Sequence, residues 1–261
     1  MTTYMKDYQE KYSVAEIIRD ETGVMEVRLH TDGGPLVWGE TAHREISGLF
    51  GDIADDRENR VLILTGSGDR FIADMDSESL AGIDTPIGWD KIFFEGRRML
   101  RNLLDIECPV ISAINGPSVE HSEIGLLGDI VLCSDNAVFR DGPHFANGLV
   151  PGDGVNLLFP LLMGLNRGKY YLLMGQELNA QEALDYGLVS EVTTQDELLP
   201  RAREIARQFA LKPTLTLKYT RIALAQTTRK LFSDHLGYGL AMEGTALMSM
   251  GTQNFDFLPE S

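Results

Sequence analysis

Positively charged residues are few in this chain. Its 23 lysines and arginines stand against 39 aspartates and glutamates, which gives a formal net charge of −16 over 261 residues. A surface of this charge repels nucleic-acid phosphates and anionic lipid headgroups, so no nucleic-acid or membrane partner is expected. No apolar run approaches the roughly 20 residues of a membrane-spanning helix, and residues 1–7 lack the basic-then-apolar layout of a signal peptide. We therefore expect a cytoplasmic protein.

Cysteine is equally scarce. Cys108 and Cys133 are the only two, and neither belongs to a Cys-x-x-Cys pair. Such usage is typical of buried thiols in a reducing compartment and argues against a disulfide framework or a zinc site. A dinucleotide-binding loop is also missing, because Gly66-Ser67-Gly68 is not extended to the full glycine motif before a helix.

Strand and helix patterns alternate in the first part of the chain. Residues 24–30 alternate apolar and polar side chains, which predicts a half-buried strand, and 61–65 read as a fully buried one. Further strands are expected at 110–114, 130–133 and 137–139. Helices are expected behind Thr41 as N-cap and over 90–105. This alternation predicts an α/β architecture.

Helices dominate from about residue 155 onward. Asn179 and Glu182 form a capping box, Gly187 stands where the helix should stop, and Pro213 separates two later helices. We expect a core over residues 1–200 and a C-terminal helical region over 201–261.

An ordered series of motifs resembles the crotonase (enoyl-CoA hydratase/isomerase) superfamily over residues 15–250. The resemblance implies a crotonase-type spiral of ββα units with a helical C-terminal trimerisation region, hence a homotrimer or a dimer of trimers. The motifs that carry it are residues 61–66, Asn115-Gly116, Gly128-Asp129-Ile130, 135–139, 148–152 and 175–183.

Two loops depart from the superfamily pattern for CoA thioesters. Members of the superfamily form an oxyanion hole from backbone N–H groups of two glycine-bearing loops, but here residues 71–76 and 118–123 contain no glycine. Glycine lets a ligand oxygen approach the backbone closely, so its loss closes that approach and leaves side chains as donors. The hydratase glutamate of Gln-Pro-Glu is replaced by His144, and Asp153 is a charged residue where Pro-Gly-x-Gly has an apolar one.

These departures resemble the 6-oxocamphor hydrolase branch of the superfamily. The branch consists of β-diketone hydrolases that cleave a carbon–carbon bond by a retro-Claisen reaction, and the resemblance implies no CoA, no other cofactor and no metal. The residues that carry it are Trp38, His43, His121, 141–145, 151–154 and Glu243.

The chemistry of the side chains agrees with this resemblance. His144 suits the base that activates water, and Asp153, nine residues later, could orient its ring and stabilise its cation. A buried His–Asp pair that only satisfies two core groups is the plain alternative. His121 could donate to an enolate oxygen, or it could be a surface histidine. Trp38 offers an indole N–H and an apolar plate, or it is a core tryptophan.

The remaining candidates depend on less. Spacing does not distinguish a site role for His43 from a solvated position, and the resemblance alone suggests that Glu243 pairs with His43. The pocket lining is expected to draw on the region 71–95, which contains Phe71, Met75, Trp89, Phe93 and Phe94.

The sequence thus predicts a cofactor-independent hydrolase that cleaves a small-molecule β-diketone to a keto acid, or to an acid and a ketone. Two other functions stay open. One is a CoA-dependent crotonase with an unusual oxyanion hole, against which the lost glycines and the negative charge argue. The other is a non-catalytic scaffold or RNA-binding relative, against which the charge argues again.

Overall fold

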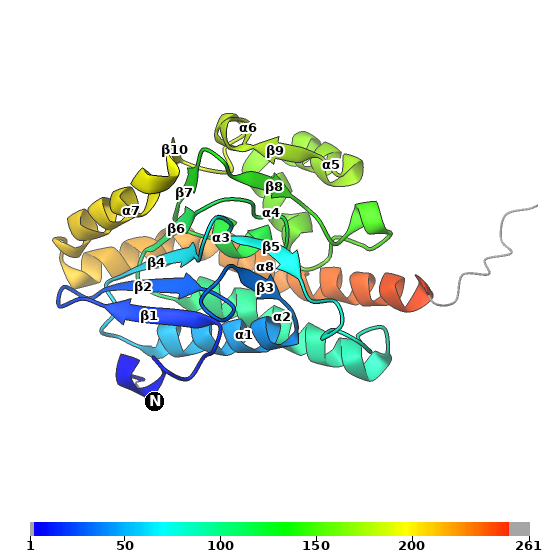
Figure 1. Cartoon of the computed structure of the whole chain (residues 1–261), viewed down its shortest axis with the longest axis horizontal. Helices are drawn as coiled ribbons and strands as arrows, with labels where there is room; N and C mark the ends of the chain where they lie inside the picture. The colour runs from blue at the N-terminus through cyan, green and yellow to red at the C-terminus, as the bar shows by residue number, and fades with distance from the viewer. Residues whose placement is uncertain (1–2, 251–261) are drawn as a thin grey trace, which may run out of the picture.

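The computed structural model describes residues 3–250 and is built around a six-stranded sheet (Figure 1). Its order is β1-β2-β4-β6-β7-β10, and every neighbouring pair is parallel except β1 with β2. The strands are β1 (Ala15–Arg19), β2 (Val24–Leu29), β4 (Val61–Gly66), β6 (Val110–Ile114), β7 (Ile130–Ser134) and β10 (Glu191–Thr193).

Two small sheets lie beside the main one. The first pairs β3 (Leu36–Trp38) with β5 (Ile72–Met75), and the second pairs β8 (Val138–Arg140) with β9 (Glu177–Asn179). Isolated bridges from Ser118 to both Ile72 and Phe139 join them, so the loop after β6 passes between the two small sheets.

Both faces of the main sheet are covered, as alternating strand residues require. Leu62 and Leu64 face the larger core with α1 (Glu40–Asp55) and α2 (Pro86–Asp105). Val61 and Ile63 face α7 (Gln195–Ala210), whose buried stripe is Leu198, Ala202, Ile205 and Ala206. The remaining helices are α3 (Ser122–Leu126), α4 (Val155–Met163), α5 (Leu165–Met174), α6 (Ala180–Asp185) and α8 (Thr214–Met250), with 3₁₀ turns at Met5–Asp7 and Phe145–Asn147.

The 37-residue α8 runs across the molecule behind the strands and packs against α2 (Figure 1). Trp89 of α2 donates its indole N–H to the Leu240 carbonyl over 3.0 Å. Gly244 makes room for that ring, because a β-carbon there would lie 2.1 Å from the indole nitrogen. The two helices thereby form one wall, which bounds the cavity described below.

The predicted α/β fold with a helical C-terminal region is confirmed, and so are the five predicted strands and the capping box. Asn179 and Glu182 exchange side-chain and backbone hydrogen bonds of 2.9 Å each, and Gly187 follows the helix with φ +79°. Both cysteines are buried and free. Across residues 3–250, no helix has the length and apolar character needed to cross a membrane.

Other details differ from expectation. Thr41 lies inside α1, whose N-cap is Gly39. Because β3 ends at Trp38 and α1 begins at Glu40, only Gly39 separates the strand from the helix. The expected boundary between residues 200 and 201 falls within α7, which packs on the main sheet, and residues 251–261 of the expected helical region lie outside the described residues. The division into two regions stays a prediction.

Candidate active site

A cavity of about 280 Å³ lies between the small β3–β5 sheet, α2 and α8. Most of its wall is apolar, and one end is polar, with the described lining residues including no lysine or arginine. The apolar side chains are Trp38, Met75, Leu80, Ile83, Trp89, Ile92, Met99, Pro143, Leu149, Leu240 and Leu247, and the polar ones are His43, Glu120, His121, His144, Asn147, Asp153 and Glu243.

Three aromatic rings meet at the polar end. Trp38, the last residue of β3, is buried and stacks on His121 with ring centroids 3.9 Å apart at 33°. The edge of His43 faces the same indole at 5.8 Å and 84°. Trp38 therefore fixes the planes of two imidazoles, and an imidazolium stacked on an indole face gains cation–π attraction.

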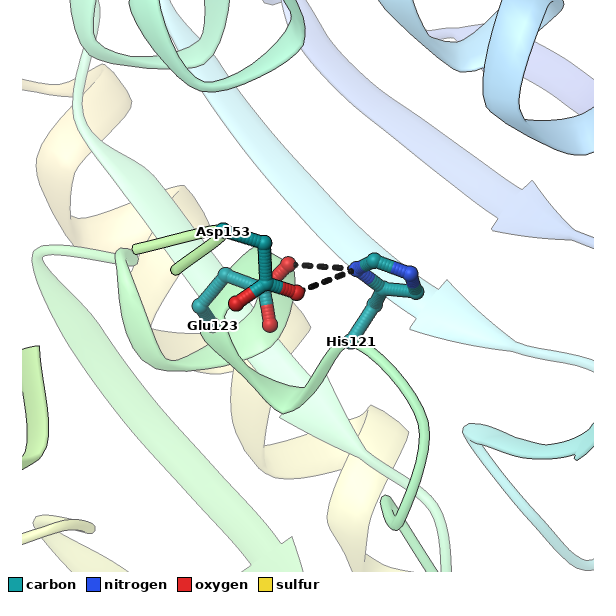
Figure 2. Close-up of side chains that lie close together, drawn as sticks. All are labelled: His121, Glu123 and Asp153. Carbon is teal, nitrogen blue, oxygen red and sulfur yellow. Dashed lines mark hydrogen bonds and ion pairs between the residues drawn. The ribbon is translucent and has the colours of Figure 1, made fainter. Parts of the chain in front are cut away.

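His121 occupies a strained backbone position as the N-cap of α3. Its φ of 44° and ψ of 45° lie in the left-handed region, which is costly for a residue with a β-carbon. Its Nδ1 lies 2.8 Å from Glu123 Oε1 and 3.2 Å from Asp153 Oδ2, while Nε2 points away from both carboxylates (Figure 2). The two carboxylates thus hold Nδ1 of His121, and Nε2 is directed away from them.

The orienting partner of His144 is Asp141, not Asp153. His144 Nδ1 lies 2.5 Å from Asp141 Oδ1, and both side chains are buried. Asp153 Oδ2 instead lies 3.6 Å from Nε2, as Glu243 Oε1 does at 3.4 Å. The expected pair of His144 and Asp153 therefore has a different geometry. Asp141 lies three residues before His144 in the same short turn, and it contacts Nδ1 of the ring. Asp153 enters from the loop before α4, on the other side of the ring.

A backbone contact between two glycines brings Asp153 and Glu243 together. A β-carbon on Gly152 would lie 2.2 Å from the Gly239 carbonyl oxygen, and one on Gly239 would lie 2.3 Å from that of Gly152. Only glycine permits this approach of the loop to α8. Asp153 follows Gly152 directly, and Glu243 lies one helical turn after Gly239, so both carboxylates reach His144.

His43 pairs with Glu95 of α2, and the suggested pairing of His43 with Glu243 is wrong. His43 Nδ1 lies 2.8 Å from Glu95 Oε2, and both side chains are buried. Glu243 Oε1 instead lies 3.4 Å from His144 Nε2. Of the expected lining region, Met75 and Trp89 face the cavity, Phe71 lies in the core, Phe93 is half-buried and Phe94 is exposed.

The buried charges shift the protonation of the three histidines in different directions. For His121, burial alone would lower the pKa, but Glu123 and Asp153 raise it to about 10. Burial likewise opposes the proton on His144, yet Asp153, Asp141 and Glu243 hold its pKa well above the ordinary value. Burial lowers the pKa of His43, which Glu95 offsets only in part. Two imidazoles therefore favour the cation, and one favours the neutral ring.

The pKa values of the carboxyl groups in the site are also shifted in different directions. Burial and the neighbouring Asp153 raise the pKa of Glu123 to about 7. Burial raises that of Glu243 as well. Burial would also raise the pKa of Asp153, but His144 and His121 lower it, which keeps this carboxylate ionised between the two rings.

Two backbone donors of the superfamily's second oxyanion loop are already engaged. The N–H groups of Val119 and Glu120 both donate to the Ile72 carbonyl, over 2.9 and 3.1 Å. These two amides are tied into the junction between the small sheets, and the side chains of His121 and Trp38 line the cavity beside them.

One group of side chains in the described part of the chain has the arrangement of a metal site. One ligand atom each from His121, Glu123 and Asp153 lies within 4.8 Å of the other two (Figure 2). The three could hold a divalent cation through one nitrogen and two oxygens. In the present arrangement, Nδ1 of His121 is the group between the two carboxylates.

Each of the three histidines has an acidic partner on Nδ1 that was not assigned from the sequence. Asp141 and Glu123 lie three and two residues from their histidines, so local spacing could have found them. Glu95 lies 52 residues from His43 on another helix, and the sequence carries no signal for that pair.

The chain is similar to a known family and to several known proteins. The family model described as enoyl-CoA hydratase/isomerase matches residues 22–251. A carnitinyl-CoA dehydratase of Proteus mirabilis is 33% identical over 224 residues, which are 85% of this chain and 83% of that protein. A short-chain-enoyl-CoA hydratase of Clostridium acetobutylicum is 32% identical over 183 residues, 69% of each chain.

Among solved structures, a β-diketone hydrolase from the cyanobacterium Anabaena, bound to (S)-3-oxocyclohexyl acetic acid, is similar with a TM-score of 0.92. It is 49% identical, and the match covers 94% of this chain and 98% of that one. An enoyl-CoA hydratase/isomerase from Mycobacterium paratuberculosis has a TM-score of 0.83 at 26% identity, over 90% of this chain and 94% of that one.

Proposed function

The chain belongs to the enoyl-CoA hydratase/isomerase family, and within that family we propose that it is a cofactor-independent hydrolase of β-diketones. The observation that carries the proposal is the polar end of the cavity, where two imidazoles with separate buried carboxylates on Nδ1 replace the glycine loops of a thioester site. The 49% identity to a β-diketone hydrolase supports the same function.

In the first step, His144 takes a proton from water through Nε2. Asp141 holds Nδ1–H, so the lone pair of the neutral ring lies at Nε2, beside Asp153 and Glu243. The oxygen of the water forms a bond to one carbonyl carbon of the diketone and gives a tetrahedral oxyanion. The new imidazolium is stabilised by the three carboxylates around it.

In the second step, the adduct collapses and the carbon–carbon bond breaks. The electron pair moves onto the second carbonyl as an enolate, whose oxygen accepts a hydrogen bond from Nε2–H of His121 and from the Trp38 indole. The imidazolium of His144 then protonates the enolate carbon. Water is consumed, a carboxylic acid and a ketone group are formed, and the base returns to its starting form.

The cavity wall indicates the kind of substrate. Its polar side chains gather at one end, the rest is apolar, and the described lining carries no lysine or arginine for a phosphate or a carboxylate. A compact, uncharged diketone suits this wall. A cyclic diketone would give one keto acid, and an acyclic one would give an acid and a ketone.

The assembly of the protein is part of the proposal. We expect a homotrimer or a dimer of trimers, in the cytoplasm. Exposed apolar side chains on α4, α5 and α8 support association, because they would leave water at an interface: Leu161, Leu165, Leu173, Met174 and Leu224. Light scattering on the purified chain measures the mass directly.

A CoA-thioester reaction is the second candidate, favoured by the names of the relatives that are 32–33% identical. The engaged amides of Val119 and Glu120, and the absence of lysine and arginine from the described cavity lining, argue against it.

The deciding experiment follows the ultraviolet absorbance of cyclic and linear β-diketones with purified protein and without CoA. We expect the absorbance to disappear, and His144→Ala to abolish the loss. Intact diketones across the panel, together with turnover of a short acyl-CoA, would reverse the order of the two candidates.

A further inference from the structure

We infer that Gly96 of α2 determines how large a diketone the active site accepts, because its missing side chain leaves room for a substrate group beside His43. The inference rests on the proposed function, since the substrate in question is the β-diketone. It concerns which diketones fit the cavity, and it leaves the catalytic steps as they are.

One stripe of α2 forms a wall of the cavity. Trp89, Ile92, Gly96 and Met99 follow one another at steps of three and four residues, which place side chains on one face of a helix, and all four line the cavity. Three of them fill their places with large apolar side chains. Gly96 is therefore a gap in this wall.

Neither the backbone nor the packing requires glycine at this gap. Gly96 lies inside α2 and has no positive φ, so its conformation is open to any residue. The three atoms nearest to a β-carbon at this position would be side-chain atoms of His43 and Leu240, at 3.4 to 3.9 Å. These are ordinary van der Waals distances, so one carbon atom fits in the gap.

Two other glycines of the same region differ from Gly96 in this respect. A β-carbon on Gly142, the other glycine of the described lining, would lie 2.6 Å from the Val119 carbonyl oxygen. A β-carbon on Gly244 would lie 2.1 Å from Trp89 Nε1. Packing explains these two glycines, whereas Gly96 weakens its helix without allowing any closer contact. What it provides is space in the cavity.

The gap lies where the added space affects the fit of a substrate. His43 borders it with Nε2, and that ring is held by Glu95 Oε2, 2.8 Å from Nδ1, and by the edge contact with Trp38. Leu240 of α8 borders it on the other helix. An alanine methyl group at position 96 would take the place of one carbon of the substrate. In a close-fitting apolar pocket, one methylene group changes kcat/KM by about 10-fold to 200-fold.

The first test compares wild type with Gly96→Ala on diketones of graded size. The smallest is 2,2-dimethylcyclohexane-1,3-dione, and the larger two carry a second pair of methyl groups at C4 or at C5. Proton NMR measures the keto acid that is released. We expect wild type to cleave at least one larger diketone, and Gly96→Ala to lower its kcat/KM relative to the smallest by about 10-fold to 200-fold. Rejection of both larger diketones by wild type, or the same preference in both proteins, overturns the inference.

Gly237→Ala is the matched control, because it also replaces a glycine inside a helix with alanine. A β-carbon on Gly237 would lie 3.6 Å from Phe93 Cζ, and Gly237 is not part of the described cavity lining. This variant should keep the wild-type preference among the diketones. Both variants should have a higher Tm than wild type, since alanine favours a helix over glycine. A lower Tm for Gly96→Ala would mean that the fold itself needs the glycine, and it would overturn the inference.

A binding experiment separates this inference from the proposed function. Trp38 and Trp89 are the two tryptophans of the chain, and both line the cavity, so tryptophan fluorescence reports whether the cavity is occupied. Cyclohexanone and the bulkier adamantan-2-one are suitable probes, because their binding needs no hydrolysis. We expect Gly96→Ala to weaken the binding of adamantan-2-one at least about 10-fold more than that of cyclohexanone.

The two proposals can then fail separately. If wild-type protein cleaves no diketone, the hydrolase proposal fails, and the ketone titrations still decide the role of Gly96. Equal weakening of both ketones in Gly96→Ala, or no binding of adamantan-2-one to wild type, overturns the inference about Gly96.

Discussion

Replacing Asp141 with asparagine tests the assembly of the catalytic base directly. The Asp141 side chain is buried, and its Oδ1 lies 2.5 Å from His144 Nδ1. Asparagine has the same shape, but its amide can donate as well as accept. If the amide nitrogen turns toward Nδ1, the ring hydrogen moves to Nε2, and the lone pair that should take the proton from water is lost.

The size of the effect follows from two contributions. A hydrogen bond to a charged group contributes about 1.5–3 kcal/mol, and about 1.36 kcal/mol corresponds to a factor of ten in rate. The loss of this hydrogen bond alone would lower kcat by about 10-fold to 150-fold. The wrong tautomer can add to it, up to about 10⁴-fold in a serine-protease triad. We expect kcat to fall at least about 100-fold, and KM to change little because Asp141 does not line the cavity.

The assay is the loss of diketone absorbance at several substrate concentrations, which separates kcat from KM. Asp129→Asn, which removes a carboxylate that pairs with Arg221 outside the cavity lining, serves as the control, and circular dichroism checks the fold. If Asp141→Asn keeps kcat within about twofold of wild type, the orientation of His144 by Asp141 is not needed for turnover. The base would then have to be sought among Asp153 and Glu243.

Three further predictions concern pH and packing. Because His144 must lose its proton to act as base and its pKa is held well above the ordinary value of about 6.5, kcat/KM should still rise with pH above that value. A maximum of kcat/KM below about pH 6.5 would contradict the role. His121 has a folded pKa of about 10 against about 6.5 unfolded, so the stability from its charge is complete below about pH 6.5 and is lost as the pH rises to 10. Thermal unfolding should show a smaller loss in Tm over this range for His121→Gln than for wild type. Gly239→Ala places a β-carbon 2.3 Å from the Gly152 carbonyl, which should cost about 1–3 kcal/mol in urea unfolding and lower kcat by displacing Asp153. If Gly239→Ala keeps both the wild-type free energy of unfolding and the wild-type kcat, the loop and α8 can move apart at no cost in free energy.

The parts of the fold that could be predicted are those determined by neighbouring residues. The buried run of β4 and the capping box of α6 each depend on a few consecutive side chains, and both are as expected. The strands β3 and β10 have only three residues each, too few for a period of two to be visible. Their pairing depends on strands that are distant in the sequence.

The candidate site shows the same limit. The spacing of His144 and Asp153 correctly indicates that they lie close together, but it cannot tell which ring nitrogen Asp153 faces. That depends on the side-chain rotamer of His144 and on the turn that begins at Asp141. The pair of His43 and Glu95 joins two helices, so it follows from the packing of α1 on α2 and not from any local pattern.

The last described helix also has a consequence for the order in which the protein matures. Leu240, Glu243 and Leu247 of α8 complete the cavity wall, and they follow every other lining residue in the chain. Chains fold from the N-terminus as they are synthesised. Until α8 is made and docks on α2, His144 and Asp153 face water and lack Glu243. The proposed hydrolysis would therefore begin only after α8 has docked on α2.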